Sequence, residues 1–334
     1  MRQALQRAWL RRGLLACLLW PLSLIYRALV ALRRGLYLSG RLRSQRLPVP
    51  VLVVGNVVAG GAGKTPVLLA LLEHLRARGI RAGVISRGYG RKSRACLEVT
   101  HDSLPEQVGD EPMLIQRAAA VPVFVAGNRV QAGHALLAAH PEVQVIVCDD
   151  GLQHLALQRD IEICVFDARG IGNGWLLPAG PLREPWLRDV DFVLADKAFD
   201  GSGSRSFSVE RDLAPLVCNS AGERVTLASL IGQPLLAVAG IANPALFFAM
   251  LRDRGLTLDC TFALPDHYDF GGAPLPLEPQ LTVVCTEKDA VKLWRTRADA
   301  WAVPLLVRIQ PEFWPAFDRR LDAKLSSTHG SETA

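Results

Sequence analysis

The chain has 334 residues, enough for two domains with well-buried cores. Half of the residues are hydrophobic and 21% are charged, a balance that excludes an intrinsically disordered chain. The net charge of +6 is unevenly distributed, because residues 1–72 contain ten arginines and Lys64 but no acidic residue, which leaves −5 for the remainder. The seven cysteines form no CxxC pair, and several lie in apolar runs, which indicates reduced core thiols in a cytosolic protein.

Residues 1–46 are predicted to form a basic, membrane-associated segment. The stretch from Leu14 to Tyr26 is uncharged and contains Pro21. Arginines flank the wider apolar region at Arg11, Arg12, Arg33 and Arg34. This composition is typical of a helix at a membrane interface, where arginines meet lipid phosphates. A buried core helix and a single membrane span remain alternatives, whereas the lack of a small-residue cleavage site disfavours a secretory signal.

Between residues 47 and 200, apolar runs of strand length alternate with helical patterns. Strands are expected at Val49–Gly55, Ala82–Ser86, Val121–Ala126, Val143–Cys148, Ile161–Phe166 and Phe192–Ala195. Helices are expected at Thr65–Arg78, Glu111–Ala120 and Arg129–Ala139. Buried parallel strands with helices on both faces produce this pattern, so the sequence predicts an α/β fold with a doubly wound parallel sheet.

Residues 201–206 belong to the polar run DGSGSRS, which predicts a linker. Beyond it, residues 207–325 are predicted to form a second, smaller α/β domain. Its strands are expected at Pro234–Ala239, Leu256–Leu264, Leu281–Cys285 and Val303–Ile309, and its helices at Pro244–Arg254 and Lys288–Thr296. Residues 326–334 are polar and are expected to form a disordered tail.

A glycine-rich loop joins the first of these predicted strands to the first predicted helix. Backbone amides in such a loop can enclose a polyphosphate, and the helix N-terminus adds a favourable dipole. Lys64 would neutralise phosphate charge, and the hydroxyl of Thr65 would bind Mg²⁺. The predicted nucleotide-binding residues are Val58, Ala59, Gly60, Gly61, Ala62, Gly63, Lys64 and Thr65. Val58 replaces the first glycine of the strict P-loop pattern, and a structural turn is the alternative.

Two acidic residues follow the apolar strand Val143–Cys148, at Asp149 and Asp150. P-loop enzymes hold Mg²⁺ with an acid at the end of a neighbouring strand, so this pair predicts a magnesium site. The alternative is a pair of aspartates that only cap a turn. Together with the glycine-rich loop, the pair favours binding of a nucleotide with magnesium.

Further polar clusters follow predicted strands or open predicted helices. They lie at Ser86–Arg91, Gly109–Pro112, Gly127–Arg129, Pro178–Pro185, Pro265–Phe270 and Thr286–Asp289. Doubly wound folds build their sites at the carboxyl ends of strands, so arginines here can reach phosphates and Asp110 could accept a proton. Each cluster taken singly is also compatible with ordinary turn and capping chemistry.

The ordered set of motifs resembles one known family. The segments VGN, GGAGKTP, SRGYGR, GDEP, DDGLQH, GPLREP, DHYDF and TEKDAVK occur in this order. They resemble the tetraacyldisaccharide 4′-kinases of lipid A biosynthesis, across about residues 14–310. In that family the first loop position is also not glycine, so Val58 fits the pattern.

The resemblance implies transfer of the γ-phosphate of ATP to the 4′-hydroxyl of a tetraacylated glucosamine disaccharide 1-phosphate, with Mg²⁺. It also implies a two-domain kinase on the cytoplasmic face of the bacterial inner membrane, with an acylated lipid substrate. The family's catalytic acid corresponds to Asp110 and its partner histidine to His267. Its magnesium acids correspond to Asp149 and Asp150, and its basic residues on the substrate side to Arg129 and Arg183.

Two other classes of protein agree less well with the sequence. A GTPase switch would need an Asn-Lys-x-Asp run after a strand, and the sequence contains none. An ATPase that handles nucleic acid would spread basic residues over its body, whereas residues 73–334 carry −5. The sequence therefore predicts no nucleic-acid partner.

Overall fold

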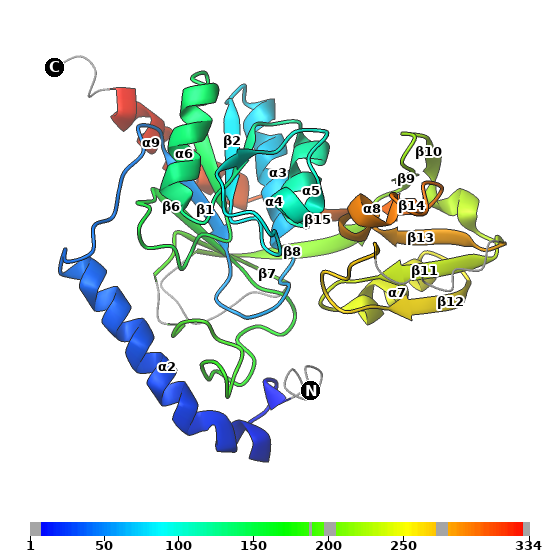
Figure 1. The fold of residues 1–334 in the computed structure, drawn as a ribbon, viewed down its shortest axis with the longest axis horizontal. Coiled ribbons are helices and arrows are strands. Elements are labelled where there is room, and N and C mark those ends of the chain that lie inside the picture. The colour runs from blue at the N-terminus through cyan, green and yellow to red at the C-terminus, as the bar shows by residue number, and fades with distance from the viewer. Residues whose placement is uncertain (1–7, 187–188, 197–204, 272–279, 330–334) are drawn as a thin grey trace.

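The computed structural model describes residues 8–186, 189–196, 205–271 and 280–329, which form two sheets (Figure 1). The larger sheet has the strand order β15-β8-β7-β6-β1-β5-β2-β4-β3. Its strands are β1 (Val51–Gly55), β2 (Ala82–Ser86), β3 (Leu97–Glu98), β4 (Val123–Val125), β5 (Val145–Asp149), β6 (Ile161–Val165), β7 (Phe192–Ala195), β8 (Arg205–Leu213) and β15 (Leu305–Ile309). Neighbours from β8 to β4 are parallel, and both edge strands are antiparallel.

Helices cover both faces of this sheet, as the apolar strands predicted. In β1, Leu52 and Val54 pack into one core, and Val51 and Val53 pack into the other. Successive side chains of a strand point to opposite faces, so both faces must be covered. The first core includes helices α3 (Lys64–Ala77), α5 (Asp110–Ala119) and α9 (Phe313–His329), and the second includes α6 (Arg129–Ala139). The short helix α4 (Pro105–Val108) precedes α5. The prediction of a doubly wound parallel sheet is confirmed.

The smaller sheet lies beside the larger one and has the order β10-β9-β14-β13-β11-β12 (Figure 1). Its strands are β9 (Leu216–Cys218), β10 (Arg224–Thr226), β11 (Leu235–Ala239), β12 (Leu258–Ala263), β13 (Thr282–Thr286) and β14 (Trp301–Val303). A 3₁₀ turn (Leu227–Leu230) and the helices α7 (Pro244–Asp253) and α8 (Glu287–Leu293) accompany it. Two apolar clusters of its own fill the space around these strands.

The boundary predicted between the two domains differs from the one observed. Strand β8 pairs with β7, and β15 pairs with β8, so both belong to the larger sheet. The expected strand Val303–Ile309 is two strands, because Pro304 has no amide hydrogen and separates β14 from β15, which lie in different sheets. The smaller sheet is therefore inserted in the chain between β8 and β15, and the second domain does not span residues 207–325.

The predicted linker and the predicted disordered tail also differ from the structure. Arg205 and Ser206 begin β8, and residues 201–204 of the predicted linker lie outside the described residues. Helix α9 continues to His329, and the hydroxyls of Ser326 and Ser327 donate hydrogen bonds to helix carbonyls. The expected disorder therefore does not begin at residue 326, and residues 330–334 lie outside the described residues.

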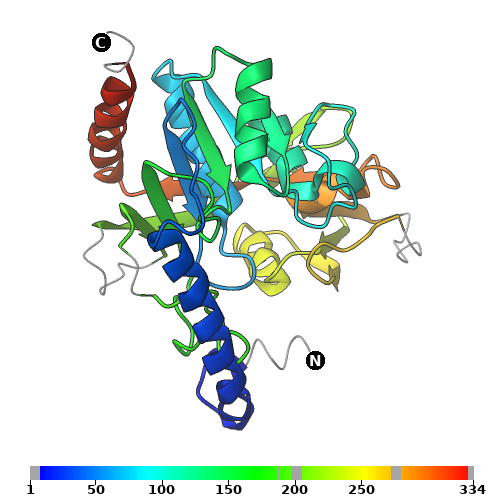
Figure 2. The same cartoon turned by 60° about the vertical axis from the view of Figure 1, so that its left-hand side comes forward.

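Helix α2 (Leu14–Leu38) is a single helix of 25 residues that projects from the body (Figures 1 and 2). At 1.5 Å per residue it is about 38 Å long. By length and composition it could cross a membrane, and only 11% of its most apolar window is buried. Ala16 and Ser23 are its buried residues. This exposure contradicts the alternative of a buried core helix.

The place of α9 in the larger domain can be tested through Phe317, which is fully buried and contacts the rings of Phe192 and Phe313. Phe317→Ala should lower the free energy of unfolding by about 3–5 kcal/mol, because it leaves a cavity in the first core. Urea denaturation measures this loss. Ser327→Ala, an exposed change on the same helix, is the matched control. Equal stability of the two variants would contradict the assignment of α9 to this core.

Candidate active site

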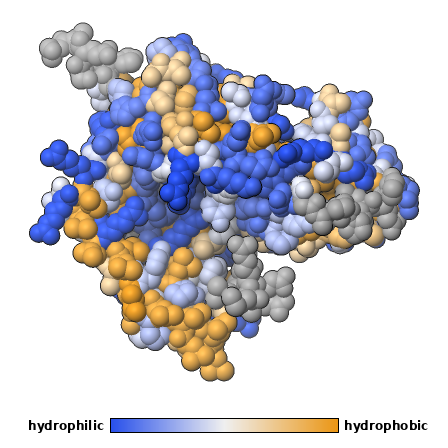
Figure 3. All heavy atoms as spheres, viewed as in Figure 1, coloured by the Kyte–Doolittle hydropathy of each residue, from blue (hydrophilic) through white to orange (hydrophobic). Residues whose placement is uncertain are grey.

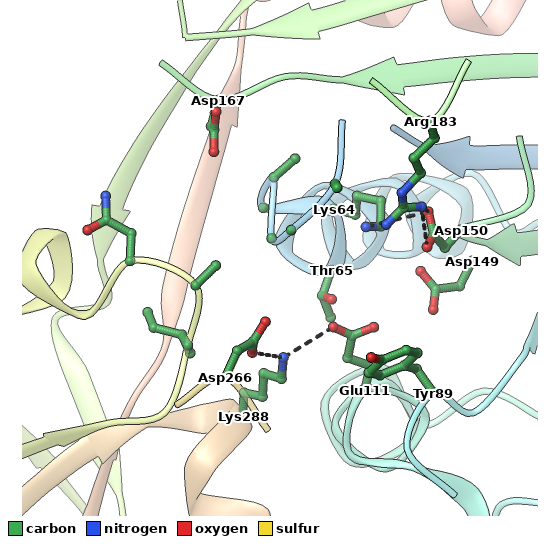
Figure 4. Close-up of a pocket in the computed structure, with 18 of the residues that line it drawn as sticks. Lys64, Thr65, Tyr89, Glu111, Asp149, Asp150, Asp167, Arg183, Asp266 and Lys288 are labelled. Atoms are coloured by element: carbon green, nitrogen blue, oxygen red, sulfur yellow. Dashed lines mark hydrogen bonds and ion pairs between the residues drawn. The ribbon is translucent and has the colours of Figure 1, made fainter. Parts of the chain in front are cut away.

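A cavity of about 1860 Å³ opens between the two sheets, at the carboxyl ends of the parallel strands (Figure 4). Residues of the larger domain line one side, including the loop after β1 and the end of β5. The N-terminal part of α7, the loop at residues 263–267 and Lys288 of α8 line the other side. Crevices of this kind are where open α/β sheets bind ligands.

The glycine-rich loop has a backbone suited to phosphate. Gly60 and Gly63 adopt φ angles of 97° and 70°, in the left-handed region that favours glycine, and α3 begins at Lys64. Residues 59–65, which are predicted to bind the nucleotide, line the cavity. Val58 differs, because its side chain is buried and its backbone forms a bridge with Leu182.

Two arginines that the sequence reasoning missed donate hydrogen bonds to carbonyls of this loop. The Nη2 atom of Arg169 donates to the carbonyl of Gly61 at 2.6 Å, and that of Arg211 donates to the carbonyl of Ala62 at 3.2 Å. The carbonyls of Gly61 and Ala62 are bonded in this way, and the amide of Ala59 donates to the carbonyl of Pro181, so the amides after Ala59 are the ones suited to a phosphate. No local motif identified these arginines, which lie more than 100 residues further along the chain.

Asp149 ends β5 and is almost fully buried. Its Oδ2 accepts a hydrogen bond from Ser86 at 2.9 Å, whereas its buried Oδ1 has no hydrogen-bond partner among the described residues. Burial raises the pKa of Asp149 to about 7, and the nearby carboxylates of Glu111 and Asp150 add to this effect. A buried carboxylate oxygen without a donor is suited to a bound cation, so the residues present fit Mg²⁺.

Protein side chains would supply only part of the ligand set that magnesium requires. Thr65 and Asp149 line the cavity together with Asp150 (Figure 4). The described residues contain no group of three or more His, Cys, Asp or Glu side chains able to hold a metal. Magnesium usually keeps several waters and binds substrate phosphates with one or two carboxylates, which agrees with such a sparse set.

Asp150 is held by three basic side chains and has a φ of 48°, rare for a residue other than glycine. Arg183 approaches its carboxylate at 2.9 Å and Lys64 at 3.5 Å (Figure 4). Arg129 donates to its backbone carbonyl at 3.4 Å. Burial alone would raise the pKa of Asp150, but Lys64 and Arg183 lower it below its ordinary value. The two arginines predicted for the substrate thus lie beside the acidic pair.

The loop that carries Arg183 is attached to α2. The hydroxyl of Tyr26 donates to the carbonyl of Arg183 at 2.8 Å. The hydroxyl of Ser23 donates to the carbonyl of Leu176 at 2.9 Å and accepts from the amide of Ala179. These three hydrogen bonds attach residues 176–183 to α2.

Asp110 and His267 come from different sheets but are in contact. Asp110 begins α5, and its Oδ2 lies 3.2 Å from Nδ1 of His267, 157 residues away in the chain. Lys292 of α8 approaches the same oxygen at 2.7 Å. Burial would raise the pKa of Asp110, but hydrogen bonds from His267 and Lys292 lower it. The predicted pairing of Asp110 with His267 is therefore present in the geometry.

Two glycines let Asp110 lie close to the end of β2. Gly88 and Gly109 have φ angles of 65° and 94°, and their backbones are in direct contact. A Cβ on Gly109 would lie 3.0 Å from backbone atoms of Gly88, and one on Gly88 would lie 2.4 Å from the carbonyl oxygen of Val108. The motifs SRGYGR and GDEP are therefore one packed unit.

Lys288 and Lys292 were missed as site residues, although the TEKDAVK run that contains them was noted. They lie four residues apart on α8, so both point to the same side of the helix. Lys288 contacts Asp266 at 2.9 Å and Glu111 at 3.4 Å across the cavity (Figure 4). The i, i+4 spacing of the two lysines was the available signal.

Taken together, the loop between β1 and α3, the lysine and threonine at the helix start, and the acidic pair at the end of the adjacent strand define a P-loop nucleotide-binding enzyme. A family model described as tetraacyldisaccharide-1-P 4′-kinase matches residues 15–326. The chain belongs to this family.

Several known proteins are similar to this chain over nearly its whole length. A tetraacyldisaccharide 4′-kinase from Acidovorax sp. (strain JS42) is 58% identical over 329 residues, covering 98% of this chain and 97% of the relative. One from Verminephrobacter eiseniae is 59% identical over 321 residues, covering 95% of this chain and 75% of the relative. The structure of LpxK from Aquifex aeolicus in complex with ATP has a TM-score of 0.81 and 30% identity, and the match covers 92% of this chain and 100% of that one.

The glycine contact leads to a prediction about catalysis. Gly109→Ala should lower kcat by about 10–100-fold, because a shift near 1 Å at the start of α5 would misplace Asp110. Gly90→Ala is the matched control, since Gly90 also has a positive φ, of 82°, but a Cβ there would meet nothing within 4 Å. Steady-state kinetics measure kcat and a thermal melt measures stability, so an effect on catalysis can be separated from an effect on folding. A similar kcat in both variants would show that the backbone contact does not position Asp110.

Proposed function

We propose that this chain transfers the γ-phosphate of ATP to the 4′-hydroxyl of a tetraacylated glucosamine disaccharide 1-phosphate in the cavity between the two sheets. As a member of its family, the chain is an ATP-dependent kinase of lipid A biosynthesis. The observation that carries the residue-level mechanism is the contact of Asp110 with His267, a residue that lines the same cavity as the glycine-rich loop.

Residues 59–65 are proposed to hold the triphosphate of ATP. Their amides and the N-terminus of α3 favour negative charge, and Lys64 adds a cation at the same end of the cavity. The similar Aquifex aeolicus protein binds ATP, which supports this assignment.

Thr65, Asp149 and Asp150 are the residues that would hold Mg²⁺. When bound, the ion would neutralise charge on the phosphate oxygens. The open Oδ1 of Asp149 supports this role. Arg183 and Lys64 hold the Asp150 carboxylate in a fixed position beside it.

Asp110 is proposed as the base for the sugar hydroxyl. The proton of the 4′-hydroxyl moves to the Asp110 carboxylate as the hydroxyl oxygen forms a bond to the γ-phosphorus. The bond between that phosphorus and the β–γ bridging oxygen breaks, and ADP leaves with the electron pair. His267 orients Asp110 through the 3.2 Å contact, and Arg129 with Arg183 would stabilise charge on the substrate side.

The reaction is proposed to occur at a membrane surface, on the cytoplasmic face of the bacterial inner membrane. Exposed apolar side chains run along α2, and Figure 3 shows a continuous apolar region there. They are Leu14, Leu18, Leu22, Ile25, Leu29 and Leu32. Arg33 and Arg34 of α2 line the cavity, so an acylated, phosphorylated lipid could contact the helix and the site together. Nucleic acid is not a proposed partner.

The activity is tested by ATP turnover in detergent micelles with and without the tetraacylated disaccharide 1-phosphate. Wild type should release ADP and form the 4′-phosphorylated lipid only with the lipid present. Lys64→Met should lose about 100-fold or more in kcat, because charge at the transferred phosphate is no longer neutralised. Lys92→Met, at an exposed lysine outside the cavity lining, should retain activity. ATP turnover that ignores the lipid would contradict the proposed function.

Membrane binding is tested by neutralising Arg11, Arg12, Arg33 and Arg34 with glutamine. Binding to anionic vesicles should weaken by about 1 kcal/mol per arginine near the surface, and less at high salt, where the attraction is screened. Neutralising the exposed Arg76, Arg94, Arg252 and Arg319 removes the same charge elsewhere and is the control. Co-sedimentation with vesicles measures the effect. Equal binding by both variants at low salt would contradict an electrostatic role for the arginines flanking α2.

A further inference from the structure

Lys292 makes three contacts at the junction of the two sheets. Its Nζ lies 2.7 Å from Oδ2 of Asp110, 3.2 Å from the carbonyl oxygen of Tyr268 and 3.4 Å from that of His267. Its side chain is largely buried, and the cavity lining includes Lys288 but not Lys292. Lys292 therefore contacts the proposed base and the backbone of its partner, whereas Lys288 faces the cavity.

We propose that Lys292 is a positioning residue for proton transfer: it keeps Asp110 ionised and fixes the backbone that presents His267. The inference rests on the proposed function of Asp110 as base. It adds a third residue, from α8, to the pair that the sequence indicated.

The hydrogen-bond directions around His267 follow from Lys288. Its Nζ lies 3.2 Å from Nε2 of His267, and an ammonium group can only donate. Nε2 of His267 is therefore the acceptor, and the Nδ1–H group donates to Oδ2 of Asp110. Two donors, from Lys292 and His267, thus meet at Oδ2, and Oδ1 is the oxygen assigned to take the proton of the substrate.

The backbone of His267 needs to be held in place. Its φ of 63° lies in the left-handed region, which is unfavourable for a side chain of this size. The amide of His267 donates to the carbonyl of Gly240, and Lys292 binds the carbonyls of His267 and Tyr268. Lys292 is the contact in this set that also reaches Asp110, so it couples the loop to the base.

The charge of Lys292 matters because Asp110 is almost fully buried. The groups that act on Asp110 are His267, Lys292, Lys288 and the like-charged Asp289. Lys288 is paired with Asp266, whereas Lys292 is in direct contact with Asp110 at 2.7 Å. An opposite charge at this distance lowers the pKa of a carboxyl group by about 1–3 units.

The test is the pH dependence of kcat/KM for Lys292→Met and Lys292→Arg, with ATP and the lipid substrate. In Lys292→Met the acid limb should move up by about 1–3 pH units, because the Asp110 carboxyl would gain a proton more readily. The loss relative to wild type should therefore be larger at pH 6 than at pH 8, with little change in KM for ATP. Lys292→Arg keeps the charge and should keep the position of the limb.

Arg295→Met is the matched control. Arg295 forms a 2.7 Å ion pair with Glu106 of α4, so it also joins the two sheets, but both side chains are exposed and neither touches Asp110. Its pH profile should equal that of wild type. An unchanged acid limb in Lys292→Met, or the same shift in Arg295→Met, would overturn the proposal. If wild type itself shows no lipid-dependent turnover, the proposed function fails instead.

A double variant covers the case in which Lys292→Met alone fails to fold. Removing both partners of a buried pair costs less than leaving one unpaired, so Asp110→Asn with Lys292→Met should fold. If Lys292 acts through Asp110, adding Lys292→Met to Asp110→Asn should lower the residual kcat by less than about twofold. A multiplied loss in the double variant would show that the lysine acts elsewhere.

Discussion

The interaction on which the site depends is the contact between α5 of the larger sheet and α8 of the inserted one. The proposed base lies on α5, whereas its histidine and both lysines belong to the insert. Neither sheet alone contains a complete proton-transfer unit. A separation of the two sheets would leave Asp110 buried without its charge partners, a state that is costly for a carboxylate. In the proposed mechanism, contact between the two sheets and proton transfer are thereby linked through one ion pair and one hydrogen bond.

The two neighbouring acids at the other end of the cavity have contrasting surroundings. Asp150 has three basic neighbours and a lowered pKa, whereas adjacent Asp149 has a hydroxyl partner, an open oxygen and a raised pKa. One acid is therefore satisfied by the protein, and the other is suited to an external cation. Asp149 is the last residue of β5, whereas Asp150 follows the strand with a φ of 48°, so the two neighbouring carboxylates leave the backbone in different local geometries.

The sequence predicted the central parallel strands and the helices α3, α5 and α6 well, because these strands are apolar on both faces and these helices have recognisable ends. It also predicted the contact of Asp110 with His267, through the family resemblance. It did not predict α9. It did not predict that β8 and β15 return to the larger sheet, because the pairing of β15 with β8 is a contact across about 100 residues that no local pattern encodes. Arg169, Arg211 and Lys292 were missed for the same reason: their partners are distant in sequence.

Helix α2, the proposed membrane-binding element, is linked by hydrogen bonds to the phosphate end of the cavity. Its hydroxyl contacts at Ser23 and Tyr26 hold the residues 176–183, and Arg183 at the end of this loop binds Asp150. A helix bound to lipid would thus be two hydrogen-bonded links away from a phosphate-site carboxylate. Because a backbone carbonyl accepts the Tyr26 bond, the link fixes the position of the loop and leaves the guanidinium of Arg183 with Asp150. If lipid binds α2 as proposed, the same helix would also set where the hydroxyl of the lipid meets the phosphate.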